Sequence, residues 1–378
     1  MRIQDFTKHV CWLLLLLLIS ACEERYMPNV IVAPNRFLVV SGFINIGEGA
    51  TTIKLSRAQN LSDDSAPTVE SGAIVWVEGD NGATATLEEA IPGTYTYNGS
   101  ELKGMSKCRL RIRAANKEYA SELVTAKKTP PIDSISWKPD DTGLDVFVNT
   151  HDPLNQTRYY RWDYDDAWEY LAEYYAELEY VNNEIKRRDA DSDEIYRCYQ
   201  FGKSTNILLN NTLKLSDDRV SEFRLLRIPS VSTKLRSRYS ILVRQYAISK
   251  EEFEYYDILR KNTESLGTLF DPLPSQLIGN ISCLSNPDEI VIGYVGAYSV
   301  EQKRIFISRS ELPGRWRRPR ANCRLDTLDV GDAILYLESG GYLPVAEYIE
   351  AGQLQYTISS KSCVDCRVSA TNVKPSYW

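Results

Sequence analysis

Short stretches in which apolar and polar residues alternate dominate the sequence from residue 36 onward. Residues 108–113 alternate with a strict period of two, and residues 51–56 and 73–77 alternate in the same way. This period places the apolar side chains on one face of a strand. Asn81-Gly82 and Pro92-Gly93 supply turn signals between such stretches. About seven short strands in roughly 90 residues predict an immunoglobulin-like β-sandwich over residues 36–128.

A second β-rich region is predicted over residues 132–378, after the Pro130-Pro131 pair breaks the first pattern. Strands are expected at 132–137, 143–149, 158–164, 238–246, 289–298 and 304–308. Two helical insertions interrupt them. Residues 165–188 carry apolar side chains at helical spacing, with acidic residues first and basic residues last. Residues 249–264 begin with a capping box, Ser249 to Glu252. The predicted fold class is therefore mainly β with helical insertions.

The N-terminal segment has a different pattern. Arg2 and Lys8 precede an unbroken apolar run at 11–19, which is too short to cross a bilayer as a helix, since that takes about 20 residues. The run ends with Ile19, Ser20 and Ala21 before Cys22, the order of a bacterial lipobox. We predict a signal peptide at 1–21, lipidation of Cys22 and a polar tether at 22–35. An ordinary cleaved signal peptide is the alternative.

Composition excludes some function classes. The net charge of −7 becomes −8 once residues 1–21, which carry two basic residues and one acidic residue, are removed. A mildly acidic body argues against a nucleic-acid partner, because phosphate binding needs a basic face. Only His151 remains after His9 leaves with the signal peptide, which excludes multi-histidine metal sites. His151 is predicted to lie in a turn.

Cysteine usage suggests disulfides. Apart from Cys11 and Cys22, an even number of cysteines remains, which favours disulfides in an exported chain, although six cysteines allow 15 pairings and the sequence selects none. The candidates are Cys108, Cys198, Cys283, Cys323, Cys363 and Cys366. The last two form a CxxC pair, for which metal binding and redox exchange are the alternatives.

Several segments together resemble a known family. They are the lipobox, residues 37–43, 130–135, 239–246, 270–274, 279–281, 292–295 and 304–307, and the ending Cys363-Val364-Asp365-Cys366 with Lys374-Pro375-Ser376-Tyr377-Trp378. In this order they resemble a Bacteroidota outer-membrane lipoprotein family that is catalogued as a domain of unknown function, number 4249. The resemblance implies a lipid-anchored protein of the outer membrane that accompanies a TonB-dependent transporter. Glu23 and Glu24 after the lipidated cysteine resemble a signal for the cell-surface leaflet. The resemblance implies no catalytic residues and no cofactor.

Two surfaces are candidate partner sites. Trp168, Tyr170 and Tyr174 belong to the densest aromatic cluster, and on a helix they leave a second aromatic face exposed after the first has packed. Core packing is the alternative for this cluster. Arg315, Trp316 and Arg317 open a basic run that suits anionic headgroups or an acidic partner, or is an ordinary solvated loop.

Three weaker motifs complete the candidates. Asp189, Asp191 and Asp193 have the alternating carboxylates of a calcium loop but lack its glycine and its final glutamate. Residues 201–205 resemble the tail of a phosphate-binding loop without its first glycine. Asp163, Asp165 and Asp166, near Glu169 and Glu173, offer paired carboxylates for glycoside hydrolysis, or are surface charges.

The leading hypothesis is a non-enzymatic accessory or binding lipoprotein of the outer membrane, acting with a TonB-dependent transporter in nutrient uptake. An extracellular hydrolase of glycans or peptides and a surface adhesin are the alternatives.

Overall fold

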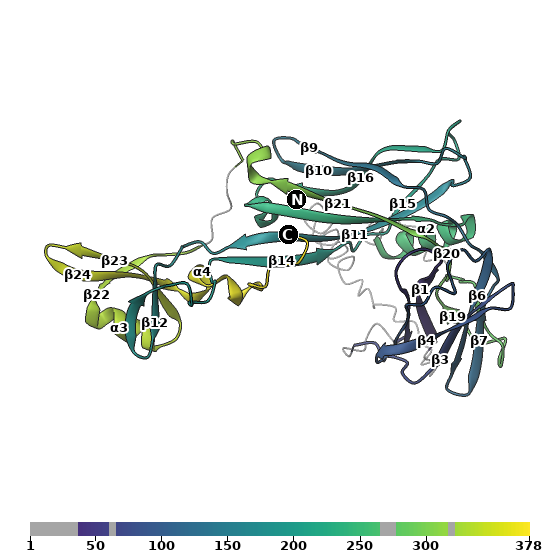
Figure 1. Ribbon diagram of the computed structural model, residues 1–378, viewed down its shortest axis with the longest axis horizontal. Helices are drawn as coiled ribbons and strands as arrows, with labels where there is room; N and C mark the ends of the chain where they lie inside the picture. The colour runs from purple at the N-terminus through teal and green to yellow at the C-terminus, as the bar shows by residue number, and fades with distance from the viewer. Residues whose placement is uncertain (1–36, 60–65, 265–276, 317–321) are drawn as a thin grey trace, which may run out of the picture. The chain divides into compact units, whose positions relative to one another are not determined.

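The computed structural model describes residues 37–59, 66–264, 277–316 and 322–378, and within them the protein is mainly β (Figure 1). The predicted signal peptide, the lipidation site Cys22 and the tether lie outside the described residues. In the part of the chain that is described, no helix is both long and apolar enough to span a bilayer.

The first sheet contains eleven strands in the order β18-β7-β6-β3-β4-β5-β2-β1-β19, with β8 paired to β6 and β20 paired to β1. Its end strands β18 and β19 contact each other, so that the sheet folds into a nearly closed, barrel-like sandwich. Apolar side chains from alternate positions fill it, among them Leu38, Val75 and Tyr95, none of which is exposed to solvent. Its strands are β1 (Leu38–Asn45), β2 (Thr51–Arg57), β3 (Ile74–Gly79), β4 (Thr84–Ile91), β5 (Thr94–Tyr97), β6 (Lys107–Ala114), β7 (Lys117–Ser121), β8 (Val124–Thr125), β18 (Ile281–Cys283), β19 (Val291–Ile292) and β20 (Ala297–Tyr298).

Both predicted turns of this region are confirmed. Gly82 and Gly93 adopt φ of 81° and 74°, a conformation that glycine reaches without strain, and they join β3 to β4 and β4 to β5. The immunoglobulin-like topology stays a prediction. Residues 36–128 do not complete the sheet alone, because β18, β19 and β20 come from residues 281–298 and pair with β7 and β1.

A second sandwich packs a three-stranded sheet, β16-β10-β9, on a five-stranded sheet, β14-β11-β17-β21 with β15 paired to β11. Trp162 and Tyr239 from the larger sheet and Val146 and Val148 from the smaller one share this core. The smaller sheet consists of β9 (Ile132–Pro139), β10 (Gly143–His151) and β16 (Arg219–Pro229). The larger sheet consists of β11 (Tyr159–Leu171), β14 (Arg197–Lys203), β15 (Leu208–Asn211), β17 (Arg238–Ala247) and β21 (Val300–Ser308).

The helix predicted at 165–188 is wrong. Strand β11 continues to Leu171 and is paired on both sides, with β14 and with β17. A hairpin follows, made of β12 (Leu178–Val181) and β13 (Glu184–Arg187). Its two-residue loop is Asn182-Asn183, with φ of 53° and 61°. Tyrosine and tryptophan favour strands when both edges are paired, and here this outweighs an accidental helical spacing.

The helix predicted at 249–264 is confirmed as α2 (Lys250–Glu264). Ser249 caps it, since its Oγ accepts a hydrogen bond from the Glu252 N–H at 3.0 Å. The other half of the capping box does not form, because the Glu252 side chain bonds to Tyr298 instead.

The C-terminal residues form a further sheet, β22-β24-β23, called the C-terminal sheet, which the sequence pattern did not predict. Helix α3 and strand β12 of the hairpin lie beside this sheet (Figure 1). The hairpin and α3 share an apolar core with the sheet, in which Ala333, Leu337 and Ile358 are buried. Its elements are β22 (Asp326–Asp329), α3 (Val330–Glu338), β23 (Tyr342–Glu350), β24 (Gln353–Ser360) and α4 (Lys361–Val364). Three short 3-10 turns are η1 (Thr233–Leu235), η2 (Arg309–Glu311) and η3 (Cys366–Val368).

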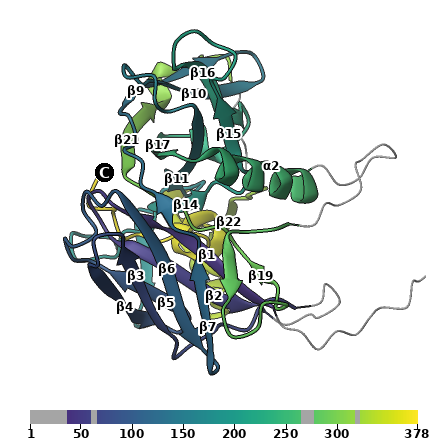
Figure 2. The same cartoon turned by 90° about the vertical axis from the view of Figure 1, so that its right-hand side faces the viewer.

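The predicted linker at 127–131 is held by hydrogen bonds. The Lys127 N–H donates to the Ala297 carbonyl at 2.9 Å, and the Thr129 N–H donates to Ser299 Oγ at 2.9 Å. Gln245 Nε2 of β17 donates to the Pro130 carbonyl at 2.8 Å. Since Thr129 is also buried, this segment is an ordered connection from the first sheet to β9 of the second sandwich; strands of both are labelled in Figure 2.

Candidate functional site

Four of the six candidate cysteines form two disulfides, Cys198–Cys366 and Cys323–Cys363. The CxxC pair therefore does not close on itself: each of its cysteines bonds to a different, earlier segment. Cys108 and Cys283 are free and buried in the core of the first sheet. Burial raises the pKa of the Cys108 thiol to about 12, which keeps it protonated and unreactive at neutral pH.

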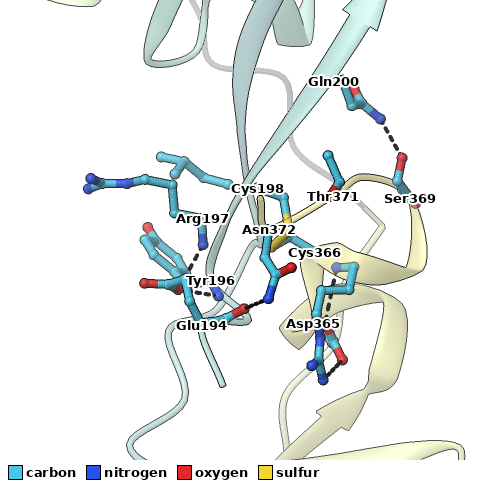
Figure 3. Close-up of a disulfide and its surroundings, with 12 residues drawn as sticks. Glu194, Tyr196, Arg197, Cys198, Gln200, Asp365, Cys366, Ser369, Thr371 and Asn372 are labelled. Atoms are coloured by element: carbon cyan, nitrogen blue, oxygen red, sulfur yellow. Dashed lines mark hydrogen bonds and ion pairs between the residues drawn. A yellow bond between two sulfur atoms is a disulfide. The ribbon is translucent and has the colours of Figure 1, made fainter. Parts of the chain in front are cut away.

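The Cys198–Cys366 disulfide joins β14 to the C-terminal segment (Figure 3). Tyr199 and Thr371 exchange two backbone hydrogen bonds of 2.7 and 3.1 Å, and Gln200 Nε2 donates to the Ser369 carbonyl at 2.9 Å. The C-terminal segment is therefore held along β14 by covalent and hydrogen bonds together.

The chain end packs on the larger sheet of the second sandwich. Trp378 lies edge-on to Tyr199 and Phe306, and its Nε1 donates to Glu169 Oε1 at 3.1 Å. The Tyr377 ring lies 3.6 Å from the Arg304 guanidinium carbon. These contacts give the aromatic end of the chain a packing role.

The predicted aromatic partner surface does not form as one helix face. Trp168 is 9% exposed and donates from Nε1 to Gln200 Oε1 at 2.9 Å. Tyr170 packs beside the Cys198–Cys366 disulfide, and the Tyr174 hydroxyl donates to the Cys323 carbonyl at 3.0 Å. The sequence missed this arrangement because alternate residues of a strand face opposite ways.

The basic run is also divided. Trp316 is 5% exposed and packs in the core of the second sandwich, where its Nε1 donates to the Asp140 carbonyl at 2.9 Å. Arg315 is exposed and forms an ion pair with Asp141. Arg317 lies outside the described residues. Of this predicted surface, Arg315 alone is shown exposed in the described part.

The weak calcium motif is not assembled as a ligand cluster. Asp189 Oδ1 accepts hydrogen bonds from the Asp191 N–H at 3.0 Å and from Ser192, while Asp193 pairs with Arg367 at 2.6 Å. Among the described residues, no group of three or more histidine, cysteine or acidic side chains is placed to hold a metal ion.

Two other sequence motifs have ordinary structural places. His151 ends β10, rather than lying in a turn, and its Nδ1 lies 2.8 Å from Asp133 Oδ2. Gly202 and Lys203 lie within β14, so that residues 201–205 form no phosphate-binding loop.

The carboxylates proposed for hydrolysis are each matched by a polar or basic neighbour. Arg244 lies between two of them: its Nε is 2.5 Å from Asp163 Oδ1 and its Nη1 is 2.6 Å from Asp165 Oδ2. The hydrogen bond from Arg244 lowers the pKa of Asp165 and outweighs partial burial. Asp165 is therefore ionised at neutral pH.

The other three carboxylates are held apart from this pair. Asp166 is 2% exposed and accepts hydrogen bonds from Lys234 and from the Tyr239 hydroxyl. Glu169 accepts from Ser237 and Trp378. Glu173 forms a 3.0 Å ion pair with Arg236. The acidic candidates thus lie along β11 and, for Glu173, just after its end, and each has its own hydrogen-bond or ion-pair partner.

Asp163, Asp165 and Arg244 line a polar groove of about 960 Å³. Strands β1 and β2 of the first sheet form one side, and β11, β17 and β21 form the other. Lys54 and Lys203 add two further positive charges, and within the described residues their ammonium groups form no ion pair. The remaining lining is Ser41, Phe43, Asn45, Glu48, Gly49, Ala50, Thr52, Tyr164, Ser204, Tyr246, Val300 and Gln302.

A buried polar cluster leads away from this groove. The Tyr246 hydroxyl donates to Asp163 Oδ2 at 2.8 Å, and the Arg161 guanidinium carbon lies 4.2 Å from the Tyr246 ring centre. Arg161 Nη2 donates to the Tyr298 hydroxyl at 3.2 Å, and that hydroxyl donates to Glu252 Oε1 at 3.0 Å. The cluster joins β17, β11, β20 and α2.

Glu252 is the most perturbed acid of this cluster. It is 1% exposed, and burial raises its pKa to about 7, although Arg161 and the Tyr298 hydroxyl act in the opposite direction. Sequence reasoning assigned Glu252 to the helix cap. The sequence carries no local signal for the burial of Glu252, because this burial depends on β20, which covers the first turn of α2.

Comparison with protein families gives one match. Residues 23–304 match the family described as "Domain of unknown function (DUF4249)". The chain belongs to this family. The match covers the first sheet and most of the second sandwich and ends before the C-terminal sheet. A search of curated proteins found no match.

Proposed function

We propose that this member of the family is a lipid-anchored accessory or binding protein of the outer membrane that works with a TonB-dependent transporter in nutrient uptake. The lipobox ending at Cys22 and the acidic Glu23 and Glu24 support the location. Two or more acyl chains on one cysteine are needed for stable anchoring, as a single chain binds membranes only marginally.

The observation that favours binding over hydrolysis is the position of Arg244 between Asp163 and Asp165. A glycoside hydrolase needs one protonated carboxyl group and one carboxylate on either side of the substrate. Arg244 keeps Asp165 ionised, which removes it as the proton donor. The groove around these residues instead offers fixed charges and amide, hydroxyl and aromatic groups, which suit the recognition of a polar ligand.

The proposal is tested in native membranes. The protein is immunoprecipitated from a detergent extract of outer membranes, and co-purifying proteins are identified by mass spectrometry. We expect a TonB-dependent transporter to be recovered in a constant ratio to the protein. The Cys22→Ser variant, which cannot be acylated, is expected to leave the membrane fraction and to lose the transporter.

Two results would contradict the proposal. One is recovery of the wild-type protein alone under conditions that keep other outer-membrane complexes intact. The other is hydrolysis of a glycan or peptide by the purified protein that the Asp163→Ala and Asp165→Ala substitutions abolish, which would favour the enzyme alternative.

A further inference from the structure

A second hollow, of about 450 Å³, lies against the first turn of α2. We call it the Glu252 pocket. Segment 122–127, the start of β11 and strand β20 complete its walls. It is distinct from the polar groove, although the buried cluster that contains Arg161 and Tyr298 connects the two.

One oxygen of Glu252 has no hydrogen-bond donor in the described part of the chain. Oε1 accepts from the Tyr298 hydroxyl, and no donor contacts Oε2. Leaving a buried carboxylate oxygen unpaired is costly, because the lost hydration is not replaced. A nearly fully buried carboxylate with a free oxygen in the wall of a pocket is therefore suited to a donor that comes from outside the chain.

Gly296 makes room for the Glu252 carboxylate itself. A Cβ at this position would lie 2.1 Å from Glu252 Oε2 and 2.8 Å from a ring carbon of Tyr298. Any other residue would therefore displace the oxygen. Because Gly296 and Glu252 both line the pocket, the free oxygen lies in the pocket wall.

The other lining groups indicate the kind of ligand. Tyr159, Tyr294 and Tyr298 contribute aromatic rings, which attract cations. Lys127 is half-buried, and within the described residues its ammonium group forms no hydrogen bond or ion pair. Lys127 and Arg161 already act electrostatically on Glu252, but neither donates a hydrogen bond to its Oε2. The pocket thus contains a carboxylate oxygen and an ammonium group that each lack a hydrogen-bond partner among the described residues, and a ligand with both an ammonium group and a carboxylate would supply the two partners.

We propose that the Glu252 pocket binds a small zwitterion, a free amino acid or a dipeptide, with its ammonium group on Glu252 Oε2 and its carboxylate on Lys127. An ammonium group supplies three donors and the charge that the carboxylate needs. The volume of the pocket lies near the lower end of the range for small-molecule sites, which is consistent with a ligand of this size. This site goes beyond the proposed membrane role and does not depend on the transporter.

Binding is tested by calorimetry on the full mature lipoprotein in detergent. The probes are the free L-amino acids and L-alanyl-L-alanine, each titrated alone, and the N-acetylated form of each probe that binds. We expect at least one free probe to bind with a dissociation constant below about 1 mM. Acetylation removes the ammonium charge and is expected to weaken binding by about tenfold or more.

Variants locate the site. Glu252→Gln keeps the size of the side chain and an acceptor for Tyr298, and we expect it to weaken binding by about tenfold or more. Lys250→Gln is the matched control at the rim, since Lys250 already pairs with Glu254 at 3.6 Å, and it is expected to change binding less than about twofold. If Glu252→Gln does not fold, the comparison of free and acetylated probes on the wild-type protein decides.

The proposal is overturned if no free amino acid or dipeptide binds. It is also overturned if acetylated probes bind as tightly as free ones, or if folded Glu252→Gln binds like the wild-type protein. The transporter experiment has a separate readout, so that failure of either proposal is recognised without the other.

Discussion

At the scale of single residues, Glu252 shows how tertiary contacts override a local rule. The sequence places it at the third position of a capping box, where a glutamate normally bonds back to the helix start. In the fold, β20 lies against this turn, and the carboxyl group bonds to Tyr298. Glu252 is therefore buried beside Arg161 instead of capping the helix in contact with solvent, and this burial raises its pKa.

This shift predicts how stability depends on pH. A carboxyl group whose pKa is higher in the folded than in the unfolded state binds more protons when folded, so the free energy of unfolding falls as pH rises between the two values. For Glu252 these are about 4.5 and about 7. We expect Glu252→Gln to gain roughly 2–3 kcal/mol relative to the wild-type protein between pH 5 and pH 8.

The measurement is urea denaturation of both proteins across this pH range. Glu251→Gln serves as the control, because Glu251 is exposed on the same helix turn. A difference between Glu252→Gln and the wild-type protein that stays constant with pH would show that Glu252 does not titrate with a raised pKa.

At the scale of elements, the segment from Asp165 to Arg188 shows that pairing with distant strands can override a local helical pattern. Its helical spacing is real, but β11 finds a partner on each side, and no local pattern shows that. One local signal was present: Asn182-Asn183 is a two-residue turn between stretches of strand-forming residues. Asparagine tolerates the positive φ that such a turn needs.

Substitutions in this turn are expected to change the stability of the protein in opposite directions for a hairpin and for a helix. In a hairpin, replacing both residues by alanine removes the amide side chains whose local hydrogen bonds make the left-handed region tolerable, at a cost of up to roughly 1–2 kcal/mol each, so that Asn182→Ala/Asn183→Ala should destabilise the protein. In a helix the same change should stabilise it, because alanine is the better helix former. Thermal unfolding distinguishes the two. Asn183→Gly alone, which gives the Asn-Gly pair favoured in a two-residue hairpin turn, is the matched control and is expected to be neutral or mildly stabilising.

The disulfides show a second limit of sequence reasoning. The even number of cysteines in a chain expected to be exported predicted disulfides but no pairing, because pairing depends on which segments the fold brings together. Cys366 meets Cys198 because the C-terminal segment runs along β14, and Cys363 meets Cys323 one turn earlier. By contrast, the strands at 51–56 and 108–113 were predictable, since each has one face in a core and a clear period of two.

Removing the longer-range disulfide should destabilise the fold. Residues Cys198 and Cys366 are separated by 168 positions, so that the bond restricts the unfolded chain strongly. We expect Cys198→Ala/Cys366→Ala to lower the free energy of unfolding by roughly 2–5 kcal/mol. Cys108→Ala, at a free buried cysteine, is the control for loss of side-chain volume alone. Equal losses in the two variants, measured by urea denaturation, would contradict a structural role for the bond.

At the scale of the whole molecule, the first sheet and the second sandwich are built from interleaved stretches of the chain. Strands from residues 281–298 return to the first sheet after the second sandwich has begun, and the segment at 127–131 is bonded to them. The groove and the Glu252 pocket both lie where elements of the first sheet meet elements of the second sandwich. Ligand sites at such junctions are common because both partners contribute polar groups.

The membrane role depends on a segment that precedes this folded body. If Cys22 carries acyl chains, the described residues form a binding module tethered to the outer membrane, and both proposed sites lie outside the cytoplasm. If it does not, the transporter proposal loses its basis, whereas the groove and the pocket are unaffected.

Acylation of Cys22 is tested by intact-mass spectrometry of the mature protein purified from native membranes. We expect a chain that begins at Cys22 and carries a diacylglyceryl group with a mass consistent with lipoprotein processing. A chain that retains residues 1–21, or that begins with an unmodified residue, would rule out the lipid anchor.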